Sequence, residues 1–136
     1  MSQVDKTTNR LYAACAKAIK GDAHDAFVAI ALDEGSMAGF TEATDGLATE
    51  STISGLGRAA GTVTLATVAA ANDQVCINIE MAAGAGATIN GFGVFNGTVA
   101  EAATGLMQFC AFAASQVLAV DDKLNNTAKC QFKLGV

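Results

Sequence analysis

The chain contains no proline and no tryptophan, and aromatic residues of all kinds make up only 6% of it. Charged residues make up 15%, against about 25% in an average globular protein. Much of the surface must therefore carry small or neutral side chains, or be covered by another protein. Such a surface is typical of a subunit packed into an assembly, and the alternative is a soluble monomer with few surface charges.

Positive charge is especially scarce: eight lysines and arginines stand against 13 acidic residues, which gives a formal net charge of −5. The basic residues are scattered, so they form no stripe that follows a phosphate backbone, and we expect no nucleic-acid partner. No apolar run approaches the roughly 18 residues of a membrane-spanning helix, and the amino terminus lacks the pattern of a signal peptide. We expect no membrane partner and synthesis in a cytoplasm.

The residue sets that support catalysis or metal binding are also missing from the sequence. The single histidine, His24, lies in a polar connection, and there is neither a Ser/His/Asp set nor a phosphate-binding loop. The four cysteines lack Cys-x-x-Cys spacing, which favours small core residues and leaves a disulfide open: Cys15, Cys76, Cys110 and Cys130. We therefore predict that the protein is not an enzyme and has no catalytic residue, no metal site and no cofactor.

Acidic residues gather between positions 33 and 50 and raise two alternatives, a glycosidase carboxylate pair and a calcium loop. The residues are Asp33, Glu34, Glu42, Asp45 and Glu50. Neighbouring residues of a strand point in opposite directions, which disfavours a carboxylate pair at 33 and 34. The stretch also lacks the Asp-x-Asp-x-Asp-Gly ladder of an EF-hand. We interpret it as a solvated loop.

The segment Thr88–Gly97 organises the rest of the predicted fold. It is rich in large apolar and β-branched residues and closes with Asn-Gly, which is typical of a strand that ends in a turn. Apolar groups at both parities indicate a central strand buried on both faces, with Ile89, Phe92 and Phe95 in the core. The glycines at positions 91 and 93 predict a bulge or a close backbone approach.

The remaining pattern predicts a single domain over residues 1–136, with an arm at residues 1–6, a helix at residues 7–20 and a β body at residues 26–136. The helix has a moderately amphipathic pattern and ends at Gly21. The other strands are expected at Ala26–Leu32, Thr62–Val68, Gln74–Met81, Gly105–Phe112 and Leu124–Leu134. The fold class is mainly β: an antiparallel β-sandwich or barrel of about six strands with one N-terminal α-helix packed on it.

Four short segments carry a resemblance to a known group of proteins. They are Ala29-Ile30-Ala31-Leu32, Leu47-Ala48-Thr49-Glu50, Gly61–Val68 and Ile89-Asn90-Gly91-Phe92-Gly93-Val94-Phe95-Asn96. Their order after an N-terminal helix resembles that in small virion structural proteins of tailed bacteriophages, which include head decoration (cement) proteins and parts of tails or fibres. The resemblance implies no catalytic residues.

From this resemblance we expect a capsid decoration protein that binds the major capsid protein and is located in the virion, after synthesis in the host bacterial cytoplasm. The alternative within the viral class is a tail, baseplate or fibre adaptor that binds tail proteins. A cellular ligand-binding β-sandwich is a third hypothesis, which the absence of tryptophan and the single tyrosine, Tyr12, disfavour.

We also expect a symmetric homo-oligomer, with a trimer favoured, because a small subunit that repeats its contacts gains avidity on a shell. Three apolar residues in segments predicted to be an arm and a loop are the candidate interface: Val4, Met37 and Phe40. Apolar residues on loops anchor an interface when a partner covers them.

Overall fold

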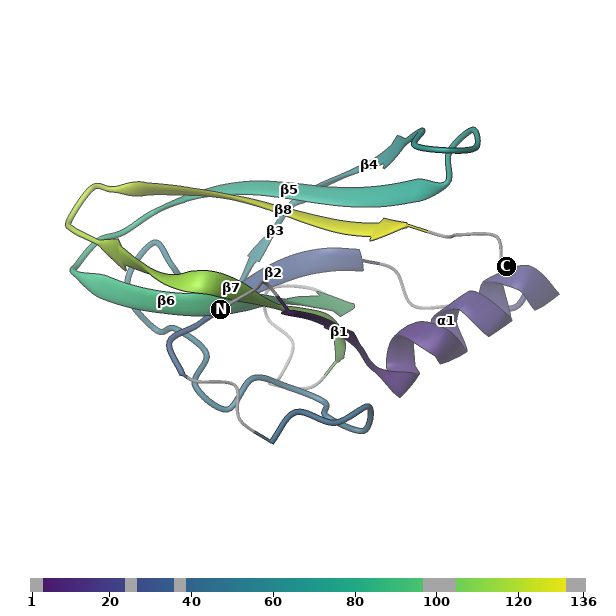
Figure 1. Cartoon of the computed structure of the whole chain (residues 1–136), viewed down its shortest axis with the longest axis horizontal. Helices are drawn as coiled ribbons and strands as arrows, with labels where there is room; N and C mark the ends of the chain where they lie inside the picture. The colour runs from purple at the N-terminus through teal and green to yellow at the C-terminus, as the bar shows by residue number, and fades with distance from the viewer. Residues whose placement is uncertain (1–3, 24–26, 36–38, 97–104, 132–136) are drawn as a thin grey trace.

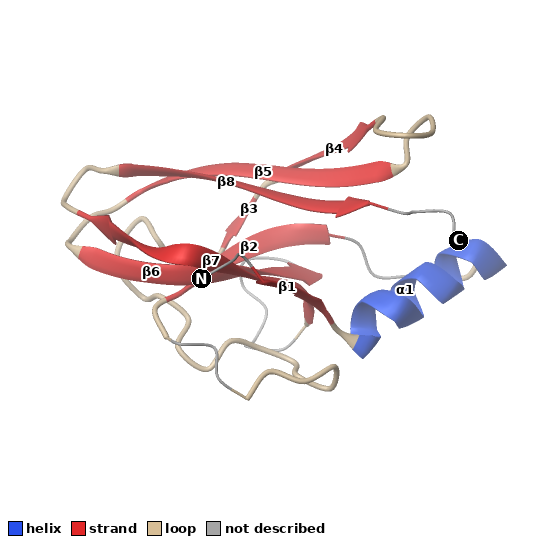
Figure 2. Ribbon diagram, in the orientation of Figure 1, coloured by secondary structure: helices blue, strands red, loops and turns tan. Residues whose placement is uncertain are grey.

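The computed structural model describes residues 4–23, 27–35, 39–96 and 105–131. It contains two antiparallel sheets and one helix near the amino terminus (Figure 1; Figure 2). The elements are β1 (Val4–Thr7), α1 (Asn9–Lys20), β2 (Phe27–Asp33), β3 (Ala59–Ala60), β4 (Thr62–Ala66), β5 (Gln74–Ala82), β6 (Ala87–Asn96), β7 (Leu106–Leu118) and β8 (Lys123–Gln131). The fold is a sandwich and not a closed barrel, which confirms the predicted class.

The larger sheet has the strand order β1-β7-β6-β2-β3, and the smaller sheet has the order β4-β5-β8. The chain passes from one sheet to the other at Gly61, between β3 and β4. A Cβ atom at this position would lie 2.6 Å from Cγ1 of Ile77 and 2.9 Å from the carbonyl oxygen of Asn78. Glycine therefore allows the crossing strand to lie against β5 at the corner of the sandwich.

Strand β6 is central in the larger sheet, between β7 and β2, as predicted from its sequence. Ile89 and Phe92 belong to the main core between the sheets, and Phe95 belongs to a second cluster on the opposite face of β6. The pairing of β6 with β7 shifts register between Ile89 and Gly91, so the bulge predicted for a glycine of this strand is confirmed. At Gly93, a Cβ atom would lie 2.6 Å from Cδ1 of Leu106, so side chains fill the space there. The segment from residue 39 to residue 58 supplies the partners on that second face, Phe40 and Leu47.

The amino-terminal segment differs from the predicted arm. Residues 4–7 form β1, which pairs antiparallel with β7 from Val4 opposite Ala111 to Thr7 opposite Gln108. Residues 4–7 are extended because their backbone groups form hydrogen bonds with the edge of β7. The helix therefore begins at Asn9 and not at Thr7. Leu11 and Ala14 pack on Met107, and Gly21 ends the helix with a φ of 87° as expected.

The other strands lie close to their predicted positions. Strands β4 and β5 form the predicted antiparallel pair, and β8 pairs with β5 along its whole length. Strand β7 continues to Leu118, six residues beyond the predicted end at Phe112. Strand β3, only two residues long, was not predicted because two alanines carry no strand pattern.

Candidate interaction site

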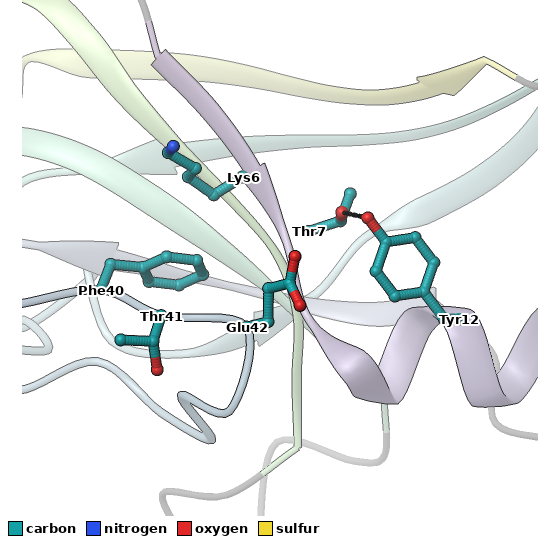
Figure 3. Close-up of a pocket in the computed structure, with 6 residues that line it drawn as sticks. All are labelled: Lys6, Thr7, Tyr12, Phe40, Thr41 and Glu42. Carbon is teal, nitrogen blue, oxygen red and sulfur yellow. Dashed lines mark hydrogen bonds between the residues drawn. The ribbon is translucent and has the colours of Figure 1, made fainter.

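A shallow pocket lies where β1, the first turn of α1 and the loop around residue 41 meet (Figure 3). Its volume is about 270 Å³. The lining residues come from three segments of the chain: Lys6, Thr7, Tyr12, Phe40, Thr41 and Glu42. Phe40, one of the three residues expected at an interface, therefore lines the pocket. Val4, another of them, lies two residues before Lys6 on the same strand.

Backbone and side-chain contacts hold the three segments together. The amide of Asn9 donates to the carbonyl of Glu42 at 2.8 Å, which fixes the loop to the start of the helix. The hydroxyl of Thr8 donates to the carbonyl of Leu106 at 2.7 Å, in place of capping the helix. The ring of Phe40 stacks on that of Phe109, with centroids 5.1 Å apart. The loop is thus attached to both α1 and β7.

The lining of the pocket is polar and its charged groups are exposed. The hydroxyl of Thr7 donates to the phenolic oxygen of Tyr12 at 2.7 Å, as the dashed line in Figure 3 marks. Lys6 and Glu42 are exposed and bring one charge of each sign. Hydroxyls with one cation and one anion suit polar contacts with another surface. These six residues contain no thiol or imidazole; their ionisable groups are the ammonium of Lys6, the phenol of Tyr12 and the carboxylate of Glu42.

The predicted interface residues have different outcomes. Phe40 lies in the predicted loop, and its ring is half-buried against Phe109, a contact that was not visible in the sequence. Val4 lies in β1, opposite Ala111, and its side chain is outside the described residues, as is all of Met37. The predicted core residues Ile89, Phe92 and Phe95 are buried.

The acidic stretch is partly structural, which corrects its interpretation as a solvated loop. Asp33 is buried at the end of β2 and accepts a hydrogen bond from the hydroxyl of Thr49 at 2.7 Å. Glu50 accepts two hydrogen bonds from Arg58, at 3.1 and 2.8 Å. The Arg58 guanidinium lies 3.8 Å from the centroid of the Phe95 ring. These carboxylates therefore attach the loop to the larger sheet.

Among the described residues, no group of three or more His, Cys, Asp or Glu side chains is placed to hold a metal ion. The predicted loop histidine, His24, lies outside those residues. Cys76 and Cys110 are buried, Cys15 and Cys130 are partly buried, and none of these four described cysteines is in a disulfide bond. Burial, and then the neighbouring Cys15, raise the pKa of the Cys130 thiol, which disfavours the nucleophilic thiolate.

Comparisons with protein-family models, curated proteins and solved structures found no match to this chain. No helix in the described part of the chain is long and apolar enough to cross a membrane. The fold, the surface and the resemblance of the sequence are therefore the support for a function.

Proposed function

We propose that the protein is a virion structural protein that decorates a bacteriophage head. It binds the major capsid protein as a homo-oligomer and stabilises the assembled shell. The observation that carries this proposal is that two of the four segments with the resemblance lie side by side in the larger sheet, and that a third meets them at the end of β2. Ala29–Leu32 lies in β2, directly beside Ile89–Asn96 in β6, and Glu50 forms a bridge with Asp33 at the end of β2.

The surface supports an assembly role. Several large apolar side chains of the described residues are exposed, on α1, β4, β7 and two turns: Tyr12, Ile19, Val63, Leu65, Val68, Val117 and Val120. Single exposed apolar residues are ordinary on a protein surface. In a chain with only 15% charged residues, however, few charged groups near them would have to lose water when a partner binds. The pocket beside α1 adds polar groups, with one charge of each sign.

The mechanism of stabilisation is mass action. A protein that binds the assembled shell, and not its dissociated subunits, raises the free energy needed to take the shell apart. A shell repeats each binding site many times, so an oligomer that engages several sites together remains bound even if each contact is weak. No chemical step is required, in agreement with the structural roles of the polar groups described above.

Ligand binding is a second candidate, and its one favourable observation is the pocket lined by Tyr12 and Phe40. Its volume of about 270 Å³ is slightly below the usual range of small-molecule sites, about 300–1,000 Å³, and such sites are mostly apolar. The pocket residues here are largely exposed and polar, and the hydroxyl of Tyr12 already accepts a hydrogen bond from Thr7. These features favour contact with a protein surface over capture of a small molecule.

The test compares virions with and without the protein, prepared from a phage whose gene for this chain is intact or deleted. Heads and tails are separated and the protein is located by mass spectrometry, and the heads are challenged by heat, chelator and osmotic shock. We expect the protein in the heads, and earlier DNA release from heads that lack it. Its absence from purified heads, together with equal survival of the deleted particles, would overturn the proposal; recovery from tails would support the adaptor instead.

A further inference from the structure

Among the strands that the structure describes, four lie at the edge of a sheet, and of these β4 has the least protection against pairing with another strand. Natural edges are usually blocked by charged residues or by very short strands. Strand β1 contains Asp5 and Lys6, β8 contains Lys123 and Lys129, and β3 is only two residues long. Strand β4 is five residues long and has no charge, no proline and no glycine: Thr62-Val63-Thr64-Leu65-Ala66.

Within the described chain β4 pairs only with β5, so every second residue directs its backbone N–H and C=O groups away from the sheet. Val63 and Leu65 lie opposite Ile77 and Val75, on the side of the small sheet that faces the core. Even so, Val63 is 46% exposed and Leu65 is 61% exposed. The larger sheet leaves this part of β4 uncovered, at the upper margin of the molecule in Figure 1. Both the backbone edge and the apolar side chains of β4 are therefore left uncovered by the described part of the chain.

We propose that β4 pairs antiparallel with β4 of a second copy of this chain, around a two-fold axis at Thr64. In this register Thr64 lies opposite Thr64 of the partner subunit, and Val63 lies opposite Leu65 of the partner subunit. The two three-stranded sheets then form one continuous sheet with the order β8-β5-β4-β4-β5-β8. The pairing does not depend on the head-decoration role.

The sequence of β4 favours a second copy because the strand has a matching pattern in both directions. An antiparallel two-fold pair sets each residue against one of similar character: Val against Leu on one face, and Thr against Thr or Ala on the other. Aliphatic pairs and Thr–Thr pairs are favourable cross-strand neighbours, and no like charges meet. An unrelated partner would need its own exposed edge strand without charged residues, whereas a second copy of this chain supplies one in β4.

The expected association is weak and depends on concentration. A five-residue strand buries less than the roughly 800 Å² per partner that is typical of a stable interface. The pairing also predicts a two-fold dimer in place of the trimer expected from the sequence. On a shell, the repeated binding sites strengthen a weak dimer, since a second subunit held nearby has a high effective concentration.

The first experiment measures the mass of the whole chain by sedimentation over a wide concentration range. Thr64→Lys places two ammonium groups across the axis and should weaken dimerisation at least tenfold. Val117→Lys is the matched control because Val117 is 78% exposed on the larger sheet, away from β4; it should dimerise as the wild type does. A wild type that stays monomeric or forms a trimer, a Thr64→Lys variant that dimerises normally, or equal loss in both variants overturns the proposal.

The second experiment tests the register by cross-linking. Opposed residues of antiparallel strands have Cα atoms about 4.5–5.5 Å apart, within the range that a disulfide bridges. Thr64→Cys, made in a Cys76→Ala background because Cys76 lies opposite Thr64 on β5, should form a covalent dimer with oxidised glutathione. Thr62→Cys in the same background should not, since Thr62 lies opposite Ala66 of the partner subunit and its two copies are four strand positions apart along the pair. Efficient linkage through Thr62, or none through Thr64, rules out this register.

Discussion

Strands β6 and β4 have similar local sequence and opposite surroundings. Both are rich in β-branched and apolar residues, and neither contains a charged residue. Strand β6 has a hydrogen-bonded neighbour on each side and is buried on both faces, whereas β4 has one neighbour and is mostly exposed. Local composition therefore determines that each segment is a strand, and the strand order determines which strand is in the core.

This difference has an energetic consequence. Full burial of a large aliphatic or aromatic side chain contributes about 1.5–3 kcal/mol to folding. Ile89, Val94 and Phe95 are fully buried in β6, whereas Val63 and Leu65 of β4 keep about half of their area in solvent. The stability of the subunit is thus concentrated in the larger sheet, and β4 can engage a partner without being needed for the core.

The largest effect is expected for Ile89→Asp, which should prevent folding. Ile89 is fully buried in an apolar cluster, and a carboxylate there has no partner, so the cost is several kcal/mol against a total stability of about 5–15 kcal/mol. Ile89 is a stricter test than Phe95, because Arg58 lies over the Phe95 ring and offers a charge to a carboxylate at that position. Circular dichroism and thermal melting give the measurement.

The control for this prediction is Val117→Asp, on the neighbouring strand. Val117 lies opposite Thr88, adjacent to Ile89, but its side chain is exposed. A carboxylate in solvent should cost no more than about 1 kcal/mol, mainly through strand propensity. A cooperatively melting Ile89→Asp protein would show that the side of β6 facing the small sheet is not the core.

The contrast between β6 and β4 also explains what the sequence could and could not predict. Apolar and polar residues alternate in β5 and β8, and β6 is a continuous apolar run, so these strands were predictable from residue patterns. The β4–β5 pair was also predictable, because the short connection between the two strands favours an antiparallel pair. The pairing of β1 with β7 was not, since it joins residues about 100 positions apart and Val-Asp-Lys-Thr has no distinctive period.

The candidate sites were harder to predict than the strands. The pocket is formed by residues 6–12 and 40–42, which have no shared motif and come together only because the loop is attached to α1 and β7. The exposure of β4 follows from its place at the edge of the small sheet. The sequence shows that Thr62–Ala66 has no charged residue. This lack of charge indicates a surface for strand pairing only once the segment is known to be an edge strand.

An intermediate effect is expected within the small sheet, where Ile77 and Leu65 lie on the same face. Ile77→Ala should destabilise the protein by about 2–4 kcal/mol, because Ile77 is fully buried and its truncation leaves a cavity. Leu65→Ala should cost less than about 1 kcal/mol in dilute protein, since most of the Leu65 side chain stays in solvent. Urea unfolding gives both values; comparable losses would mean that β4 belongs to the core.

One carboxylate, that of Asp73, accepts several of the hydrogen bonds in the connection between β4 and β5. Asp73 accepts hydrogen bonds from the backbone amides of Val68, Ala69 and Ala70, and from the side-chain amide of Gln131 on β8. The amides of Ala69 and then Val68 are the main cause of a pKa of Asp73 far below its ordinary value of 3.8. The ionised carboxylate therefore positions the loop that follows the exposed edge strand.

The smallest effect is expected for Asp73→Asn, and it should depend on pH. A pKa lowered by folding contributes stability that is fully present above the ordinary value of 3.8 and is lost as the pH falls toward the folded pKa. The variant should thus be less stable than the wild type at pH 7, and the gap should narrow between about pH 4 and pH 2. Urea midpoints measured across this range, with the exposed Asp45→Asn as a control for the loss of one negative charge, test the prediction. A gap that stays constant or widens in acid would show that the amide contacts of Asp73 do not favour its ionised form, and that the loop beside β4 is held by other interactions.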